Sequence, residues 1–259
     1  MPERPTPLKT VTVEQLRVEI YATRSEMGAA AASDVAARMW QICAHQQRVR
    51  TVFAAAPSQN EFLAALGAAP RVEWPRVEAF HMDEYVGLPP EAPQSFGVFL
   101  RTRLFGRVNP GRVEYINGIA PDAEAECARY AALLGERPLD IVCAGIGENG
   151  HMAFNDPHVA DFHDPQRVKV VTLDDVCRLQ QVHDGAFPTL GDVPRSALTL
   201  TMPALMSAHW LYAIVPGPTK TEAVRRALRE PISTACPASV MRRHPSAVLY
   251  LDVQSAAGI

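Results

Sequence analysis

The chain alternates between stretches with apolar residues at helical spacing and short runs of apolar, β-branched residues. Helical spacing predicts helices over residues of about 13–45, 58–66, 93–105, 122–134 and 219–228. Short apolar runs predict strands over residues 50–55, 77–82, 139–144, 210–215 and 246–252, and a strand followed by a helix over 197–208. Ser58 stands where the second of these helices would begin, in the position of an N-cap.

Strands and helices that alternate in this way favour an α/β fold. We expect a mostly parallel, twisted sheet with helices on both faces, which is a Rossmann-like three-layer sandwich. No internal repeat and no linker rich in Pro, Gly or Ser divides the chain, so we expect residues 1–259 to form a single domain. In such sheets ligands bind beyond the carboxyl ends of the strands, and candidate chemistry is sought there.

Composition adds limits to this picture. The 259 residues are 47% hydrophobic and 20% charged, as in an ordinary globular protein. A formal net charge of −3 without any Lys/Arg run argues against a nucleic-acid partner. Five scattered cysteines without a C-x-x-C pair indicate reduced thiols. The first ten residues lack the apolar core of a signal peptide, and no run of 18 apolar residues occurs. We therefore expect a cytoplasmic protein with no membrane partner.

The stretch GIGENGHMAFNDP, residues 145–157, places Gly145, Gly147 and Gly150 in the G-x-G-x-x-G spacing of dinucleotide-binding loops. Such a loop needs a helix that begins at the glycines, and Pro157 leaves little room for one because proline disfavours helix at the preceding residue. We therefore expect no dinucleotide cofactor. The glycines serve equally well to bring backbone N–H groups close to an oxyanion or hydroxyl of a small ligand.

His151 is the side chain of this loop that titrates near neutrality, and Glu148 and Asp156 are acidic neighbours that could orient its ring. A histidine bonded for structure alone is the alternative. A metal site was weighed because histidines and aspartates crowd this segment, but neither the H-E-x-x-H nor the facial-triad spacing occurs, and no metal is expected. The crowded residues are His151, Asp156, His158, Asp161, His163 and Asp164.

Three further positions follow apolar runs. Asp83 comes first in the acidic pair Asp83-Glu84, and a carboxylate there can act as a general base if its surroundings tune it; a solvated turn or a helix cap is the alternative. Ser58 stands at an expected helix start, where a phosphate can bind, but the residues by themselves favour simple N-capping. Lys220 lies in the first turn of an expected helix, where it opposes the helix dipole. This favours an anionic ligand, and a solvated lysine is a nearly equal alternative.

These stretches, in this order, resemble the glucosamine-6-phosphate deaminase (isomerase) family, which shares its fold with 6-phosphogluconolactonases. The segments FHMDEYVGLP (80–89) and GIGENGHMAFNDP (145–157) resemble its two most distinctive motifs. Further similar segments are YINGIAPD, VPRSALTLTMPALM and VPGPTK. The resemblance runs from about residue 50 to 252, and the AFNDP ending favours the deaminases over the lactonases.

The resemblance implies a role for each matching residue. Asp83 would be the base that moves a proton between C2 and C1 of the opened amino sugar, and His151 would assist ring opening with support from Asp156. Lys220 and the loop at Ser58 would hold the phosphate. The implied reaction gives fructose 6-phosphate and ammonia without metal or organic cofactor. When residues next to these in the two motifs are included, the candidate catalytic residues are Asp83, His151, Asp156, Asn149 and Glu148. The candidate substrate-binding residues are Ser58, Glu84, Gly145, Gly147 and Lys220.

The chain also departs from the family pattern. Asn149 stands where the family usually carries aspartate, so we expect a less basic His151 unless Glu148 compensates. Asp156 replaces a glutamate and shortens its reach by one methylene. The phosphate loop reads Ala55-Ala56-Pro57-Ser58, in which Ser58 alone keeps a hydroxyl.

Two further departures concern cationic positions. The family's phosphate-binding arginine has no certain counterpart, with Arg178, Gln181 or His183 as candidates. Arg167 and Lys169 keep an R-x-K pair that serves an allosteric site in some members, but a nearby hydroxyl residue is not evident, so allostery is not expected to transfer intact.

The leading hypothesis is thus a glucosamine-6-phosphate deaminase with a small sugar phosphate as its partner. A 6-phosphogluconolactonase-type hydrolase, or a deaminase for another amino-sugar phosphate such as galactosamine 6-phosphate, is the second hypothesis. A non-catalytic sugar-phosphate sensor is the third. The sequence does not fix the oligomeric state, and a homo-oligomer is compatible with it.

Overall fold

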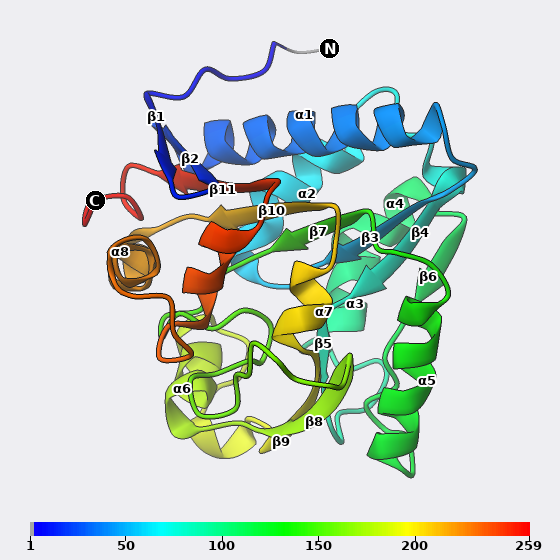
Figure 1. The fold of residues 1–259 in the computed structure, drawn as a ribbon. Helices are drawn as coiled ribbons and strands as arrows, with labels where there is room; N and C mark the ends of the chain where they lie inside the picture. Colours follow the sequence, from blue (N-terminus) through cyan, green and yellow to red (C-terminus); the bar gives the residue numbers. More distant parts are fainter. Residues whose placement is uncertain (1–2) are drawn as a thin grey trace.

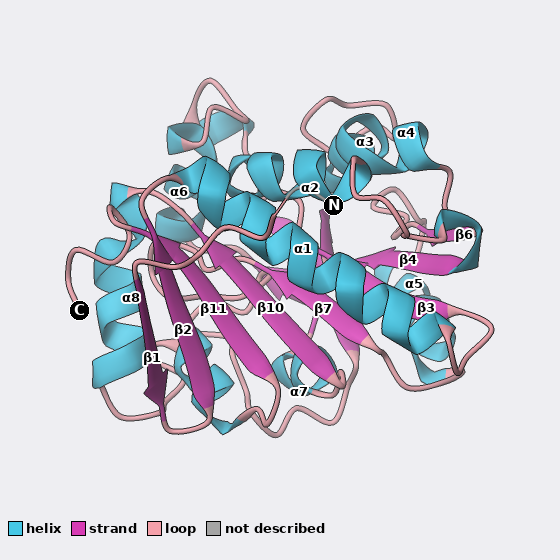
Figure 2. Cartoon of the chain, turned by 90° about the horizontal axis from the view of Figure 1, so that it is seen from above, coloured by secondary structure: helices cyan, strands magenta, loops and turns pink. Residues whose placement is uncertain are grey.

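The computed structural model describes residues 3–259 and contains an eight-stranded sheet with helices on both faces (Figures 1 and 2). The strand order is β1-β2-β11-β10-β7-β3-β4-β6, and every neighbouring pair except β1-β2 is parallel. These strands are β1 Lys9–Val13, β2 Leu16–Tyr21, β3 Val49–Phe53, β4 Val77–His81, β6 Arg112–Glu114, β7 Ile141–Ala144, β10 Trp210–Val215 and β11 Ala247–Asp252. The predicted α/β fold is confirmed.

Side chains alternate between two hydrophobic cores along the central strands, as a sheet covered on both faces requires. In β10, Tyr212 and Ile214 pack in the core that contains α1 (Arg24–Cys43) and α2 (Asn60–Gly67). Leu211 of the same strand packs in the opposite core, which contains α5 (Ala123–Gly135), α7 (Met202–Met206) and α8 (Thr221–Arg229). Figure 2 shows α1 crossing the strands on its face of the sheet.

The other helices complete the layers. They are α3 Phe96–Leu100, α4 Gly106–Val108, α5 Ala123–Gly135, α6 Asp175–His183, α7 Met202–Met206 and α8 Thr221–Arg229. The π-helical segment Arg101–Phe105 joins α3 to α4, and short 3₁₀ turns span Pro57–Gln59, Trp74–Arg76, Leu190–Asp192, Pro218–Lys220 and Pro237–Arg243. Within residues 3–259, none of the helices has both the length and the apolar character to cross a bilayer.

A second sheet of three antiparallel strands stands apart from the first. Its order is β5 (Asp83–Tyr85), β9 (Ser196–Leu200) and β8 (Val168–Thr172). Figure 1 shows this sheet and α6 below the main sheet. A separate hydrophobic cluster that includes Tyr85, Phe154 and Cys177 packs here. Because Asp83 is the first residue of β5, this sheet places the predicted base.

Two local predictions were wrong. The helix predicted over residues 13–45 begins only at Arg24, where the Thr23 hydroxyl accepts a hydrogen bond from the backbone N–H of Glu26. The preceding residues form the β1-β2 hairpin, because alternating β-branched residues there suit strand pairing. Ser58 is not an N-cap either: it lies inside a 3₁₀ turn before α2, and its hydroxyl accepts a hydrogen bond from Gln59 Nε2.

Candidate active site

A cavity of about 400 Å³ lies where the carboxyl ends of the strands meet the end of α6, and its volume suits a small-molecule ligand. Six of the ten predicted site residues line it, namely Ser58, Asp83, Gly145, Gly147, His151 and Lys220. The other four, Glu84, Glu148, Asn149 and Asp156, lie outside the lining. The cavity is also lined by side chains that the sequence did not assign to a site, including Gln180 and Asp184.

Asp83 has a carboxylate that is buried yet turned to the cavity. The side chain is 7% exposed, and it accepts no hydrogen bond from any residue of the described range 3–259. Burial, reinforced by the neighbouring charge of Glu84, raises the pKa of Asp83 well above its ordinary value. A carboxylate held without partners in this way is a stronger base than a solvated one and is free to take a proton from a ligand.

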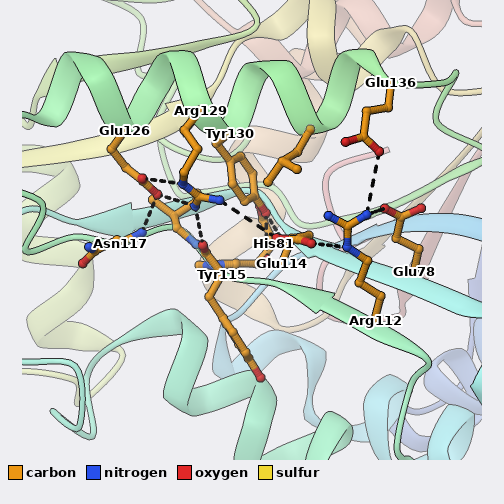
Figure 3. A network of polar contacts seen from close by, with 12 residues as sticks. Glu78, His81, Arg112, Glu114, Tyr115, Asn117, Glu126, Arg129, Tyr130 and Glu136 are labelled. Atoms are coloured by element: carbon orange, nitrogen blue, oxygen red, sulfur yellow. Dashed lines mark hydrogen bonds and ion pairs between the residues drawn. The ribbon is translucent and has the colours of Figure 1, made fainter.

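The backbone before Asp83 is fixed by a polar network between β4, β6 and α5 (Figure 3). The Tyr130 hydroxyl accepts a hydrogen bond from the His81 backbone N–H at 3.0 Å and donates to the His81 carbonyl at 2.9 Å. The His81 ring accepts a hydrogen bond at Nε2 from the Ile116 N–H, at 2.9 Å. Burial lowers the pKa of His81, in keeping with a neutral ring. Asp83 therefore follows a tightly held strand end.

Glu84 has a different environment from its neighbour. Its carboxylate accepts hydrogen bonds from the Ser95 hydroxyl at 2.7 Å and from the Gly97 N–H at 3.0 Å, at the start of α3. The backbone N–H groups of Tyr85 and Phe96 also donate to it. The structure thus places Glu84 as an anchor for the N-terminus of α3, outside the cavity that Asp83 faces.

His151 and Asp156 form a buried pair in the loop after β7. Nδ1 of His151 lies 2.8 Å from Asp156 Oδ1, at an angle that does not meet the geometry of a hydrogen bond. Burial alone would raise the pKa of Asp156, but contacts with His151 and then Asn149 bring it down to about 2. The carboxylate stays ionised and favours the tautomer with its proton on Nδ1. Nε2, without a protein partner in the described chain, is left for a ligand.

Asn149 acts on Asp156 rather than on the imidazole. Its Nδ2 donates to Asp156 Oδ1 at 2.8 Å, while its Oδ1 accepts the His151 backbone N–H at 3.0 Å. Glu148 turns away from His151: its carboxylate lies 3.5 Å from Nδ1 of His183, and its backbone N–H donates to Gln180 Oε1. The structure brings Asn149 to the His151–Asp156 pair and does not bring the carboxylate of Glu148 there.

The two predicted substrate-binding glycines are needed for space. A methyl group at Gly147 would come within 2.1 Å of Nε2 of His151, so any side chain there would displace the imidazole. At Gly145 it would lie 3.2 Å from Gln59 Nε2, in the wall formed by the loop after β3. Gly147 therefore leaves room for the imidazole, and Gly145 leaves room for the side chain of Gln59. The close approach of backbone N–H groups to a ligand stays a prediction, and no helix begins within residues 145–157.

Ser58 and Lys220 come from two strand–turn–helix junctions and line one cavity. Lys220 ends the 3₁₀ turn before α8 and is 6% exposed. Burial lowers the pKa of Lys220, while Asp184 and Glu148 oppose that shift. Within residues 3–259 its ammonium makes no ion pair of 4.0 Å or less. A desolvated lysine without a protein anion is suited to bind an anionic ligand.

The three candidates for the counterpart of the family's phosphate-binding arginine have different environments. Arg178 is buried and donates to the carbonyls of Leu190 and Val193 and to Asp175, so its guanidinium supports the α6 segment. His183 is largely exposed. Gln181 lines the cavity, and its Oε1 accepts a hydrogen bond from the Tyr85 hydroxyl at 2.7 Å. Gln181 is thus the candidate whose side chain reaches the site.

Of the pair Arg167 and Lys169, the lysine is engaged within the chain. The Lys169 ammonium donates to the Asp164 carboxylate at 2.8 Å and to the Val159 carbonyl at 2.6 Å. Lys169 is thus neutralised by a carboxylate of the same chain.

The crowded His and Asp residues do not gather as one set of metal ligands. Within the described residues, a possible ligand group consists of His151, Asp156 and Cys177, with their ligand atoms within 4.8 Å of one another. Burial raises the pKa of the Cys177 thiol, which opposes the thiolate that a metal would need. His158 instead faces Asp174, and the remaining residues make local contacts.

Gln180 and Asp184 were missed by sequence reasoning. They lie near the end of α6, a helix that the hydrophobic pattern did not predict, in a segment where the resemblance gives no clear register. The dipeptide Asp184-Gly185 resembles an ordinary surface turn, and nothing local in the sequence says that it closes over a cavity.

Known proteins resemble this chain in sequence and in structure. Residues 22–250 match the family model described as glucosamine-6-phosphate isomerases/6-phosphogluconolactonase. A glucosamine-6-phosphate deaminase from Bacillus cytotoxicus is 37% identical over 186 residues, which are 71% of this chain and 69% of the relative. The corresponding deaminase from Listeria innocua is 34% identical over 208 residues, 80% of this chain and 87% of the relative.

Solved structures of related proteins have the same fold. A monomeric glucosamine-6-phosphate deaminase superposes with a TM-score of 0.84 at 29% identity, covering 93% of this chain and 99% of its own. A 6-phosphogluconolactonase from Shewanella baltica reaches 0.76 at 18% identity, covering 95% and 100%, which speaks for the fold alone. With a family match over most of its length and deaminases among its relatives, this chain is an enzyme that belongs to the family of glucosamine-6-phosphate isomerases and 6-phosphogluconolactonases.

Proposed function

We propose that the chain is a glucosamine-6-phosphate deaminase, which converts glucosamine 6-phosphate and water into fructose 6-phosphate and ammonia. The observation that carries this proposal is the pairing of an unpartnered carboxylate, Asp83, with the His151–Asp156 pair on one cavity. The deaminases among its relatives support the same reaction. Such a site holds a base for carbon and a separate proton carrier for oxygen, which an aldose–ketose isomerisation needs.

Ring opening comes first in the proposed reaction. Nε2 of His151 takes the proton of the C1 hydroxyl, the bond between C1 and the ring oxygen breaks, and the proton returns on that oxygen. Asp156 stabilises the imidazolium that forms in between, since its own carboxylate remains ionised. Asn149 holds the carboxylate in place through its amide.

Proton transfer between carbons follows. Asp83 removes the proton on C2 of the open-chain aldehyde, and the substrate's own ammonium group gives a proton to the C1 oxygen, which leaves a neutral enolamine with a C1 hydroxyl. Asp83 then returns its proton to C1, and the nitrogen lone pair forms the iminium at C2. Water adds to this iminium, and ammonia leaves with the formation of the C2 ketone. Every atom is then accounted for without an oxidant or reductant. The cavity lining includes the apolar side chains of Met82, Phe96 and Phe99, which limit the water around Asp83.

The phosphate of the substrate would bind at Lys220 and Ser58, which line the same cavity as Asp83 and His151. Binding energy from a group remote from the chemistry can hold C1 and C2 at the base, so it contributes to rate as well as to affinity. An enzyme of this kind should therefore discriminate strongly against sugars without the phosphate.

The test is ammonia release from glucosamine 6-phosphate by the purified protein and by the Asp83→Asn variant. We expect the variant to lose about 10³-fold in kcat, the range for removal of a general base. It should fold normally and be more stable at pH 8 by about 1–3 kcal/mol, because an amide removes a buried charge whose pKa is raised. Undiminished turnover in this variant would exclude Asp83 as the base.

Parallel assays with galactosamine 6-phosphate and 6-phosphogluconolactone separate the neighbouring activities. Turnover of the lactone alone would replace the deaminase assignment by a hydrolase. Tight binding of glucosamine 6-phosphate without any ammonia would indicate a sensor.

A further inference from the structure

The cavity wall around Lys220 is poor in positive charge for a site that takes a phosphate. Lys220 is the one lysine in the lining, and the lining residues include no arginine. Asp184 contributes a carboxylate to the same wall. Arg24, which donates to the Pro57 carbonyl behind the loop after β3, is paired with Glu61. A phosphate dianion at Lys220 would therefore have one ammonium to bind it and the carboxylate of Asp184 in the same cavity.

Lys220 and Asp184 face the same space without touching. Both line the cavity and act on each other electrostatically, yet their charged atoms are more than 4.0 Å apart. The Asp184 carboxylate has one long hydrogen bond, from Gln180 Nε2 at 3.4 Å. A ligand group placed between them would have an ammonium donor on one side and a carboxylate acceptor on the other.

Hydrogen bonds also fix the orientation of the side-chain amides of Gln181 and Gln180, which line the same cavity. Gln181 is 7% exposed, and its Oε1 is taken by the Tyr85 hydroxyl, which leaves the two hydrogens of Nε2 for a ligand. Gln180 Oε1 is likewise taken by the Glu148 backbone N–H. These side chains supply hydrogen-bond donors without the positive charge of a guanidinium.

A dianionic phosphate offers only acceptors, so it suits Lys220 and Gln181 but is repelled by Asp184. A phosphate monoanion carries one P–O–H group, which can donate to a carboxylate while its other oxygens accept. We infer that Asp184 is a specificity-determining residue through which the cavity binds the substrate's phosphate as its monoanion. This inference rests on the proposed function in that it takes the ligand to be a sugar phosphate.

Other titratable groups lie near Lys220 and Asp184 or line the same cavity, and they could also change binding with pH. Glu148, from the loop after β7, acts on Lys220 but does not line the cavity, and His183 at the end of α6 pairs with Glu148. Asp83 and His151 line the cavity at the reacting carbons. A variant of Asp184 alone leaves all of these groups in place.

The experiment is calorimetric binding of sorbitol 6-phosphate, which has no amine and cannot be deaminated, between pH 5.5 and 8. The second pKa of a phosphate monoester is about 6, so the monoanion falls to about 1% at pH 8. We expect Kd of the unaltered protein to rise roughly 50-fold between pH 6 and 8. In Asp184→Asn, Kd at pH 8 should be at least about 10-fold lower than in the unaltered protein, with little difference at pH 5.5.

Glu222→Gln, which removes an exposed carboxylate on α8, is the matched control and should behave like the unaltered protein. A pH-independent Kd, or no tightening in Asp184→Asn at pH 8, would overturn the inference. Equal binding of unphosphorylated sorbitol would also overturn it, since the site would then recognise a hydroxyl. Ammonia release is measured separately, so a protein that binds in this manner but does not turn over contradicts the proposed function and leaves the phosphate inference standing.

Discussion

Asn149 and Asp156 are two departures from the family pattern that the structure joins into one contact. The shorter Asp156 carboxylate lies 2.8 Å from His151 Nδ1 and 2.8 Å from Asn149 Nδ2. The amide therefore donates to the carboxylate that supports the histidine. A second carboxylate at position 149 would instead face Asp156 at hydrogen-bond distance. The substitution that seemed to weaken His151 in the sequence thus helps to keep its partner ionised.

The Asn149→Asp variant tests this reading at the residue scale. Two carboxylates in contact cannot both ionise cheaply, so the pKa of the pair rises in the folded state. A raised carboxyl pKa means that stability is highest below the unfolded value near 4 and is lost as pH rises. We expect a loss of about 1–3 kcal/mol at pH 8 and a smaller one at pH 4.5, measured by urea unfolding. An equal loss at both pH values would show that charge is not the cause.

Asp83 and Glu84 show why residue roles are only partly readable from the sequence. The two carboxylates are adjacent, and the sequence proposed both for the site. The distinction comes from α3, whose first N–H groups and Ser95 hydroxyl occupy Glu84 and leave Asp83 without a partner. Those donors lie 11 to 13 residues further along the chain. No local pattern could have assigned them.

At the scale of elements, the strand that leads to Asp83 depends on one tyrosine of α5. The Tyr130 hydroxyl bonds the N–H and the carbonyl of His81 and also lies 3.1 Å from the Glu114 carbonyl, so it links α5 to β4 and β6 (Figure 3). Removing the hydroxyl would leave a buried N–H without its acceptor. Such a group costs free energy because water cannot replace the partner.

We therefore expect Tyr130→Phe to lower the free energy of unfolding by about 1–3 kcal/mol, measured in urea. The matched control is Tyr115→Phe, which removes a hydroxyl that makes no hydrogen bond within residues 3–259 and should change stability by less than about 0.5 kcal/mol. Equal effects of the two substitutions would contradict the role assigned to Tyr130.

Strands that are buried on both faces could be predicted, and short or partly exposed strands could not. The apolar runs that became β3, β4, β7, β10 and β11 were found because parallel strands buried on both faces read as continuous hydrophobic segments. The strand β5 has three residues, and β8 alternates only weakly between buried and half-buried positions. Their pairing with β9 is decided by tertiary packing, which a local pattern does not contain.

At the scale of the whole molecule, the cavity joins parts that are distant along the chain and belong to both sheets. Asp83 opens a strand of the second sheet, while Ser58, Gly147 and Lys220 follow strands of the main sheet. The parallel fold predicted this edge as the ligand site, since all parallel strands end there. The closure by α6 had no counterpart in the sequence pattern. A ligand in the cavity should thus hold the two sheets together.

Sorbitol 6-phosphate should therefore stabilise the whole chain against heat. A ligand at 100 times its Kd contributes about 2.7 kcal/mol, which corresponds to a rise in Tm of roughly 5–10 °C for a chain of this length. Lys220→Met keeps the apolar stem, removes the cation and should abolish most of the rise. Lys9→Met, an exposed lysine on β1, should retain it. A full Tm rise in Lys220→Met would mean that the phosphate is held elsewhere, because a desolvated ammonium that contacts the ligand cannot be removed without loss of affinity.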